Sequence, residues 1–130
     1  MRITTLGLIA AGNVLAATAA YAHHAFATEF DVERPVALEG KVTKVELINP
    51  HSWIHIEVVD EDGESTIWMV EGGSPNALVR RGVTKASIPL GVELVVNGYQ
   101  ARDGTNKAVG RDLNFADGTA LFFQGTPVPE

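Results

Sequence analysis

The sequence predicts an all-β fold with one short helix. Apolar and polar residues alternate in several segments, which is typical of strands with one buried face. Turn signals rich in Asn, Asp, Gly and Pro separate these segments. Residues 74–82 instead carry helix start and stop signals, and they fall between the third and fourth predicted strands.

The first predicted strand, 36–48, is long and bent. Its apolar residues alternate up to Val42, and the alternation resumes out of phase at Val45, which indicates a β-bulge or a strong bend. Gly40 permits the tight curvature. Residues 31–35, just before this strand, read as a polar turn.

The next two strands are predicted to form a hairpin. Residues 51–59 place Ile54, Ile56 and Val58 on one face. Residues 60–63 form an acidic turn, and residues 64–71 form the third strand. A four-residue loop would place Val59 opposite Glu64, and His55 opposite Trp68. Ile67 and Met69 would then face inward.

The predicted helix has clear start and stop signals. Ser74 is a suitable N-cap, Pro75 occupies the first helical position and Gly82 fits the C-terminal cap. Three further strands are predicted at 92–99, 107–115 and 119–123. A helix between strands three and four of a five-stranded barrel is the arrangement of the oligonucleotide/oligosaccharide-binding (OB) fold. We therefore predict a small OB-like Greek-key β-barrel, with a β-sandwich as the alternative.

The amino-terminal residues predict a secretory signal peptide. A short basic start precedes an apolar, alanine-rich run, and Ala20-Tyr21-Ala22 fits the small-x-small cleavage rule. We therefore expect a signal peptide at 1–22, a lead-in segment at 23–35, the barrel domain at 36–124 and a flexible tail at 125–130. The mature protein would reside in the periplasm or be secreted, with no stable membrane span after cleavage.

Composition restricts the function further. The 130-residue chain has 16 acidic and 10 basic residues and no cysteine. The scattered basic residues argue against nucleic-acid binding, which needs clustered Lys and Arg. Without cysteine, any metal must be bound by nitrogen and oxygen ligands.

Four local signatures accompany this pattern. They are His23-His24-Ala25-Phe26, Asn49-Pro50-His51, Trp68 with Glu71-Gly72-Gly73-Ser74-Pro75-Asn76, and Arg102-Asp103-Gly104. Together they resemble a family of small bacterial exported proteins classed only as a domain of unknown function, the family numbered 6152. The resemblance implies export and a single small domain but no activity. Ala25 stands where the family motif leads us to expect serine.

The predicted mature terminus is a candidate metal site. Cleavage after Ala22 would give His23 a free α-amine beside its imidazole, and His24 adds a second imidazole. Such a nitrogen set, completed by a third imidazole, matches the tetragonal site that Cu(II) favours. The alternative is that both histidines are merely polar residues of a frayed terminus.

His51 is the expected third ligand. His51 and His55 are four residues apart on one strand, which is about 13 Å at the rise of an extended chain, so one metal cannot bind both. His51 begins the strand at a barrel rim, whereas His55 lies in its middle. Glu71 is a candidate carboxylate ligand or an orienting partner for an imidazole. Its alternative role is a carboxylate stabilised by the helix dipole.

Trp53, His55 and Trp68 are predicted to share an outer face. Such a face suits a peptide, a glycan or a partner protein that binds by stacking, and its alternative is a face covered by Phe26 or Phe30 of the lead-in. We find no catalytic residue set. The leading hypothesis is a non-catalytic periplasmic protein that binds metal, with copper as the expected ion. The second is an interaction module, and the third is a small redox or hydrolytic metalloenzyme.

Overall fold

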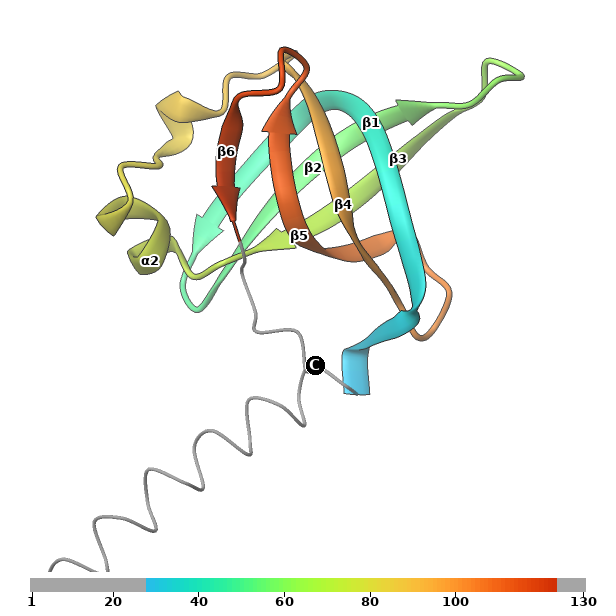
Figure 1. Ribbon diagram of the computed structural model, residues 1–130, viewed down its shortest axis with the longest axis horizontal. Coiled ribbons are helices and arrows are strands. Elements are labelled where there is room, and N and C mark those ends of the chain that lie inside the picture. The colour runs from blue at the N-terminus through green and yellow to red at the C-terminus, as the bar shows by residue number, and fades with distance from the viewer. Residues whose placement is uncertain (1–27, 124–130) are drawn as a thin grey trace, which may run out of the picture.

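The computed structural model describes residues 28–123. It contains six strands and a short helix (Figure 1). The elements are β1 (Phe30–Ile48), β2 (His51–Val59), β3 (Ser65–Gly72), α2 (Pro75–Arg80), the 3-10 helix η1 (Lys85–Ser87), β4 (Glu93–Ala101), β5 (Lys107–Phe115) and β6 (Ala120–Phe123). No helix among these residues is long and apolar enough to cross a membrane.

The strands form one sheet that closes into a ring. Its order is β3-β2-β1-β4-β5-β6, and a parallel pairing of β3 with β5 joins the two arms. All other neighbours are antiparallel, and β6 pairs with the later part of β5, after the residues of β5 that pair with β3. The all-β class with one short helix is therefore confirmed. The β-sandwich alternative does not apply, because a sandwich would have two separate sheets.

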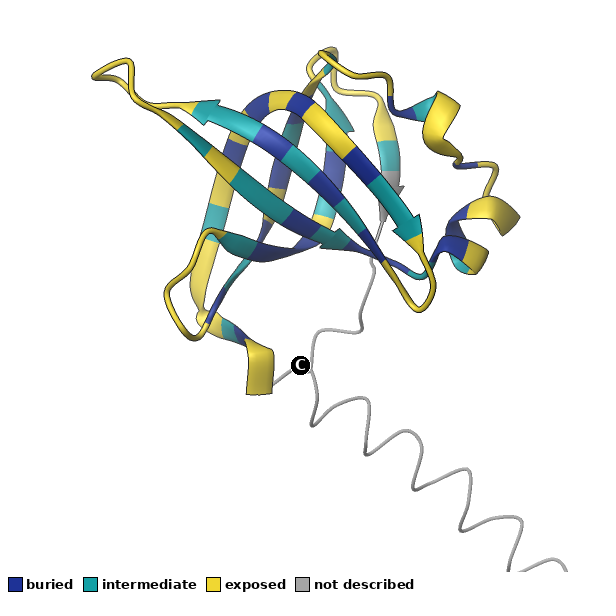
Figure 2. Ribbon diagram, turned by 180° about the vertical axis from the view of Figure 1, so that it is seen from behind, coloured by how far each residue is buried: buried dark blue, intermediate teal, exposed yellow. Residues whose placement is uncertain are grey.

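The core fills the inside of the ring. Ile54, Ile56, Val70, Leu94 and Leu113 are inaccessible to solvent, and the alternation of burial along the strands is visible in Figure 2. Leu78 of α2 and Ile88, just after η1, cover one side of the same core. Burying apolar side chains at this density supplies the main driving force for folding.

The bend in β1 lies where the pattern predicted it. The register of β1 against β2 shifts between Val42 and Lys44, and Lys41, just before this shift, pairs with both β2 and β4. A Cβ on Gly40 would stand 2.4 Å from the carbonyl oxygen of Glu57, so only glycine fits this close approach. One long strand therefore joins both arms of the ring.

The prediction of a polar turn at 31–35 is wrong. β1 begins at Phe30, which pairs with Ala101, and the register shifts between Phe30 and Pro35. Phe30 packs with Ala101 and Val109 in a second small apolar cluster, and this packing extends the strand.

The helix boundaries agree with prediction. The Ser74 hydroxyl accepts a hydrogen bond from the Ala77 N–H, and Gly82 follows the last turn with a φ of 79°.

The register predicted for the β2–β3 hairpin is wrong by one residue. Val59 pairs with Ser65 and Ile56 with Trp68. Five residues, 60–64, therefore connect the paired Val59 and Ser65, where four were expected. The Asp60 N–H donates to the Glu64 carbonyl, and the Asp60 carboxylate accepts from the Glu64 N–H. A shift of one residue turns every β3 side chain to the opposite face. Trp68 therefore packs against the core, while Ile67 is 46% exposed.

Candidate functional site

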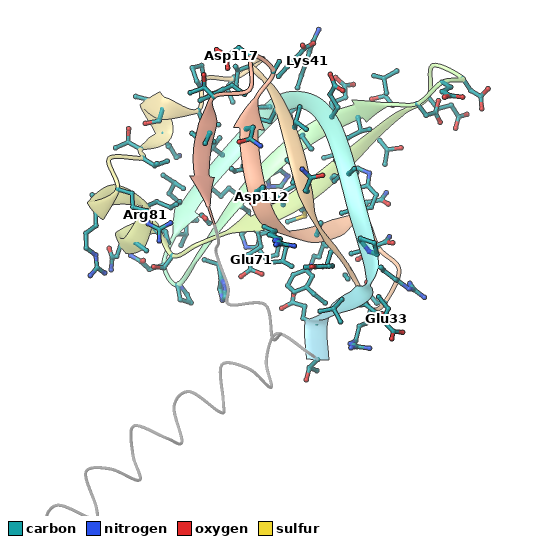
Figure 3. All side chains as sticks on the ribbon, in the orientation of Figure 1. Glu33, Lys41, Glu71, Arg81, Asp112 and Asp117 are labelled. Carbon is teal, nitrogen blue, oxygen red and sulfur yellow. The ribbon has the colours of Figure 1, made fainter. Side chains whose placement is uncertain are left out.

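A histidine–glutamate pair marks one end of the ring, where β2 begins and β3 ends. The His51 Nδ1 pairs with the Glu71 Oε1. Trp53 lies directly opposite Glu71 in the β2–β3 register, so His51 reaches diagonally across the hairpin. In Figure 3, Glu71 lies at the lower end of the ring, toward the turn from which the chain enters β1. We call this region the rim site.

The two members of the pair differ in exposure. The Glu71 side chain is 12% exposed and the His51 side chain is 54% exposed. Burial raises the pKa of Glu71, and the neighbouring Glu29 raises it further. The charge and hydrogen bond of His51 and the charge of Lys107 act in the opposite direction and lower the pKa. Glu71 is therefore a partly desolvated carboxylate that relies on His51 for compensation.

This pairing leaves the other ring nitrogen of His51 available. Within residues 28–123 no hydrogen bond involves the His51 Nε2. A carboxylate that accepts from Nδ1–H fixes the imidazole tautomer and raises the basicity of Nε2, as it does for many metal-bound histidines. The contact with His51 fits the orienting role of Glu71, one of the three roles that the sequence left open.

A buried serine fixes the start of β2. Ser52 is fully buried, and its hydroxyl donates to the Gly73 carbonyl at 2.5 Å. This bond ties the residue after His51 to the segment that follows Glu71. Both members of the pair are thus anchored by the same short stretch of backbone.

Trp53 belongs to the rim site, but it does not form an open aromatic platform. It packs against the cluster of Phe30, Ala101 and Val109. The Lys107 Nζ lies 5.4 Å from the centre of its ring, a cation–π contact. The covering by Phe30 that we considered as an alternative is therefore present. Phe26 lies outside the described residues.

The three residues of the predicted aromatic face do not gather. Trp53 and His55 lie on the outer face of β2, whereas Trp68 lies on the core side of β3 because of the register. The prediction of one face containing all three is wrong. It failed because the observed β2–β3 register differs by one residue from the expected one.

His55 has its own partners. Its Nε2 lies 2.8 Å from the Glu46 Oε2, and the Glu46 Oε1 lies 2.8 Å from the Lys44 Nζ. The hydrogen bond from Lys44 and then that from His55 lower the pKa of Glu46. The His55 side chain is 15% exposed. These contacts give His55 a structural role on the surface of β1 and β2.

His23 and His24 lie outside the described residues, so their position relative to His51 stays a prediction. Within residues 28–123, no group of three or more metal-ligating side chains is preassembled. Phe30, at the start of β1, packs with Trp53, and Trp53 lies opposite Glu71. The chain therefore enters the described domain beside the rim site.

Sequence reasoning missed Ser52, Lys107 and Glu46. Ser52 alternates in phase with the core residues Ile54 and Ile56, and this phase was the available signal for its burial. Lys107 reaches the site only through the parallel β3–β5 pairing, where it lies opposite Met69. No local sequence pattern predicts the parallel pairing of β3 with β5.

The fold and the rim site define a class: a small all-β domain, closed into a ring of strands, with a carboxylate-oriented imidazole at one end. The chain belongs to the family of unknown function DUF6152, whose model matches residues 12–111. The match spans His51 and Glu71 and confirms the family resemblance. No curated protein and no solved structure matches the chain.

Proposed function

We propose that this protein is exported and binds a copper-type metal ion through His23, His24 and His51. The His51–Glu71 pair is the observation that carries the proposal. Glu71 holds the His51 imidazole at the rim by its Nδ1. The Nε2 makes no hydrogen bond to any residue within 28–123. This is the arrangement in which histidine serves as a metal ligand.

Chain length supports the participation of the terminal histidines. His24 is five residues before Glu29, a span of about 17 Å when extended, and His23 adds one residue more. Because Phe30 packs with Trp53 and Trp53 lies opposite Glu71, this chain length is sufficient for both histidines to reach the rim site. Cleavage after Ala22 would add the α-amine of His23 and complete a nitrogen-rich set suited to Cu(II).

The second sequence hypothesis, an interaction module with an aromatic face, gains no support. Its three residues are divided between two faces of the hairpin, and Trp53 is covered by Phe30. A periplasmic protein partner stays a prediction.

Copper titration tests the proposal. The terminus of the processed protein is first fixed by intact mass, and Cu(II) affinity is then measured by competition with a chelator of known affinity. We expect His51→Ala, or one extra residue before His23, to weaken binding by tenfold or more, on the order of one lost ligand. Glu71→Gln should weaken it by about 10- to 100-fold, the usual effect of removing an orienting carboxylate.

His55→Ala is the matched control. It removes an imidazole from the same strand, about 13 Å from His51, and should leave the affinity unchanged. Equal binding by the wild type, His51→Ala and the extended variant would refute the rim site. Equal loss in His51→Ala and His55→Ala would indicate general damage to β2 and would refute it as well.

A further inference from the structure

A groove on the α2–η1 side of the ring is independent of the rim site. Thr43, Lys44 and Val45 of β1 form one wall, and Lys85, Ile88, Pro89 and Leu90 form the other. Its volume is about 350 Å³, at the small end of the range for ligand sites. None of these residues takes part in the His51–Glu71 arrangement.

The groove has an apolar floor and a cationic edge. Val45 and Ile88 are buried, while Leu90 on the wall is 69% exposed. Lys85 has no ion-pair partner within residues 28–123, and Lys44 pairs with Glu46. The groove therefore offers one uncompensated ammonium group beside an accessible apolar surface.

The surrounding chain reinforces the positive charge. Residues 72–92 contain no Asp or Glu but include Arg80, Arg81 and Lys85, in a protein with 16 acidic and 10 basic residues. In Figure 1 this segment, with α2 and η1, runs along one side of the ring. A positive region on an otherwise acidic surface attracts anions selectively.

We propose that this groove binds a single-chain amphiphile with an anionic head, of the fatty-acid class. The carboxylate pairs with Lys85 at the edge, and the alkyl chain lies along Val45, Ile88 and Leu90. Exposed leucine beside unpaired lysine matches both halves of such a ligand, whereas a simple inorganic anion would leave the apolar wall uncovered. The small volume favours one acyl chain over a two-chain lipid.

The test is a titration of the ¹⁵N-labelled protein, in the form that its host produces, with decanoate below its micellar concentration. Saturable shifts should appear at the amides of 43–45, 85–88 and 90. Decyltrimethylammonium, with the same chain and the opposite charge, and acetate, with the same head and no chain, should not produce them.

Two variants and a control complete the test. Lys85→Ala should weaken decanoate binding by about two- to fivefold, the range of one exposed ion pair. Leu90→Ser, at an exposed position, should weaken it without unfolding the domain. Arg111→Ala removes an exposed cation on β5, outside the groove, and should have no effect. The proposal would be overturned if the amide shifts were located elsewhere or if the cationic amphiphile bound equally well. It would also be overturned if Lys85→Ala bound decanoate with wild-type affinity, or if the protein bound only to anionic vesicles.

Discussion

Removing His51 should expose how far Glu71 relies on it, even without a metal. Glu71 is mostly buried, and burial is the largest influence raising its pKa, while His51 opposes that shift. Exposed ion pairs contribute about 0.2–1 kcal/mol, and breaking a buried pair costs about 3–5 kcal/mol. With one partner 12% and the other 54% exposed, this pair lies between those limits. We expect His51→Ala to lower the free energy of unfolding by about 1–2 kcal/mol at pH 7.

Glu71→Gln should behave differently. The amide oxygen of glutamine still accepts from the His51 Nδ1–H, and the buried charge is gone, so this variant should unfold at or above the wild-type temperature. The double variant should recover most of the loss caused by His51→Ala, because no desolvated carboxylate remains. A site that loses metal affinity while gaining stability is expected where function requires a costly charge.

The pH dependence has a defined sign. Because the folded-state pKa of Glu71 lies above its ordinary value of 4.5, its contribution to stability is fully present below pH 4.5 and is lost as pH rises through the folded pKa. The cost of His51→Ala should therefore be larger at pH 7 than below pH 4.5. Thermal unfolding with a chelator present measures it, and about 1 kcal/mol corresponds to about 4–8 °C in a domain of this size.

Two results would refute this reasoning. One is a cost of His51→Ala that is the same at pH 7 and below pH 4.5. The other is a Glu71→Gln variant at least as destabilised as His51→Ala at pH 7. Either would mean that the pair acts by packing rather than by compensating the Glu71 charge.

Three further predictions concern the framework of the site. Ser52→Ala should destabilise the domain by about 1–3 kcal/mol in urea unfolding, since it leaves the buried Gly73 carbonyl without its donor; wild-type stability would contradict this. Gly98→Ala should prevent folding, seen as lost amide dispersion, because its Cβ would lie within van der Waals overlap of the Val109 carbonyl; a folded variant would disprove that contact. At Asp103, hydrogen bonds from the hydroxyl and N–H of the threonine two positions later lower the pKa below its ordinary 3.8. The stability gap between wild type and Asp103→Asn should therefore be present above pH 3.8 and vanish as pH falls through the folded pKa; a constant gap across pH would refute it.

Much of the fold was predictable because its determinants are local. Alternation located β2 within its observed bounds, and the phase shift near Val42 located the bend of β1. Ser74 and Gly82 bounded the helix because caps satisfy backbone groups in their immediate surroundings. For β2, the bend of β1 and the helix, the local backbone preferences and the pattern of burial favour the same structure.

The candidate site was only partly predictable, since it depends on register and on contacts between distant segments. The carboxylate of Asp60 accepts from two backbone N–H groups, of Asp62 and Glu64, and so holds the turn in a register that differs by one residue from the expected one. That single difference moved Trp68 to the core. The same register decides the His51–Glu71 pair: in the expected register Glu71 would face inward with Ile67 and Met69, and the observed register turns it to the face that carries His51.

The rim location itself gives a reason for dividing the proposed ligands between a fixed and a tethered part. A strand such as β2 separates its two histidines by about 13 Å, so it supplies only one imidazole to a given ion. In the proposed site the remaining ligands would come from a segment that can approach the same point, and β1 begins beside it, with Phe30 packed against Trp53. His51, oriented by a carboxylate that is costly to bury, would provide the preorganised ligand of the proposed site, and the terminal histidines would provide the rest. Trp53, which packs against Phe30, lies where its fluorescence would report metal binding at the rim.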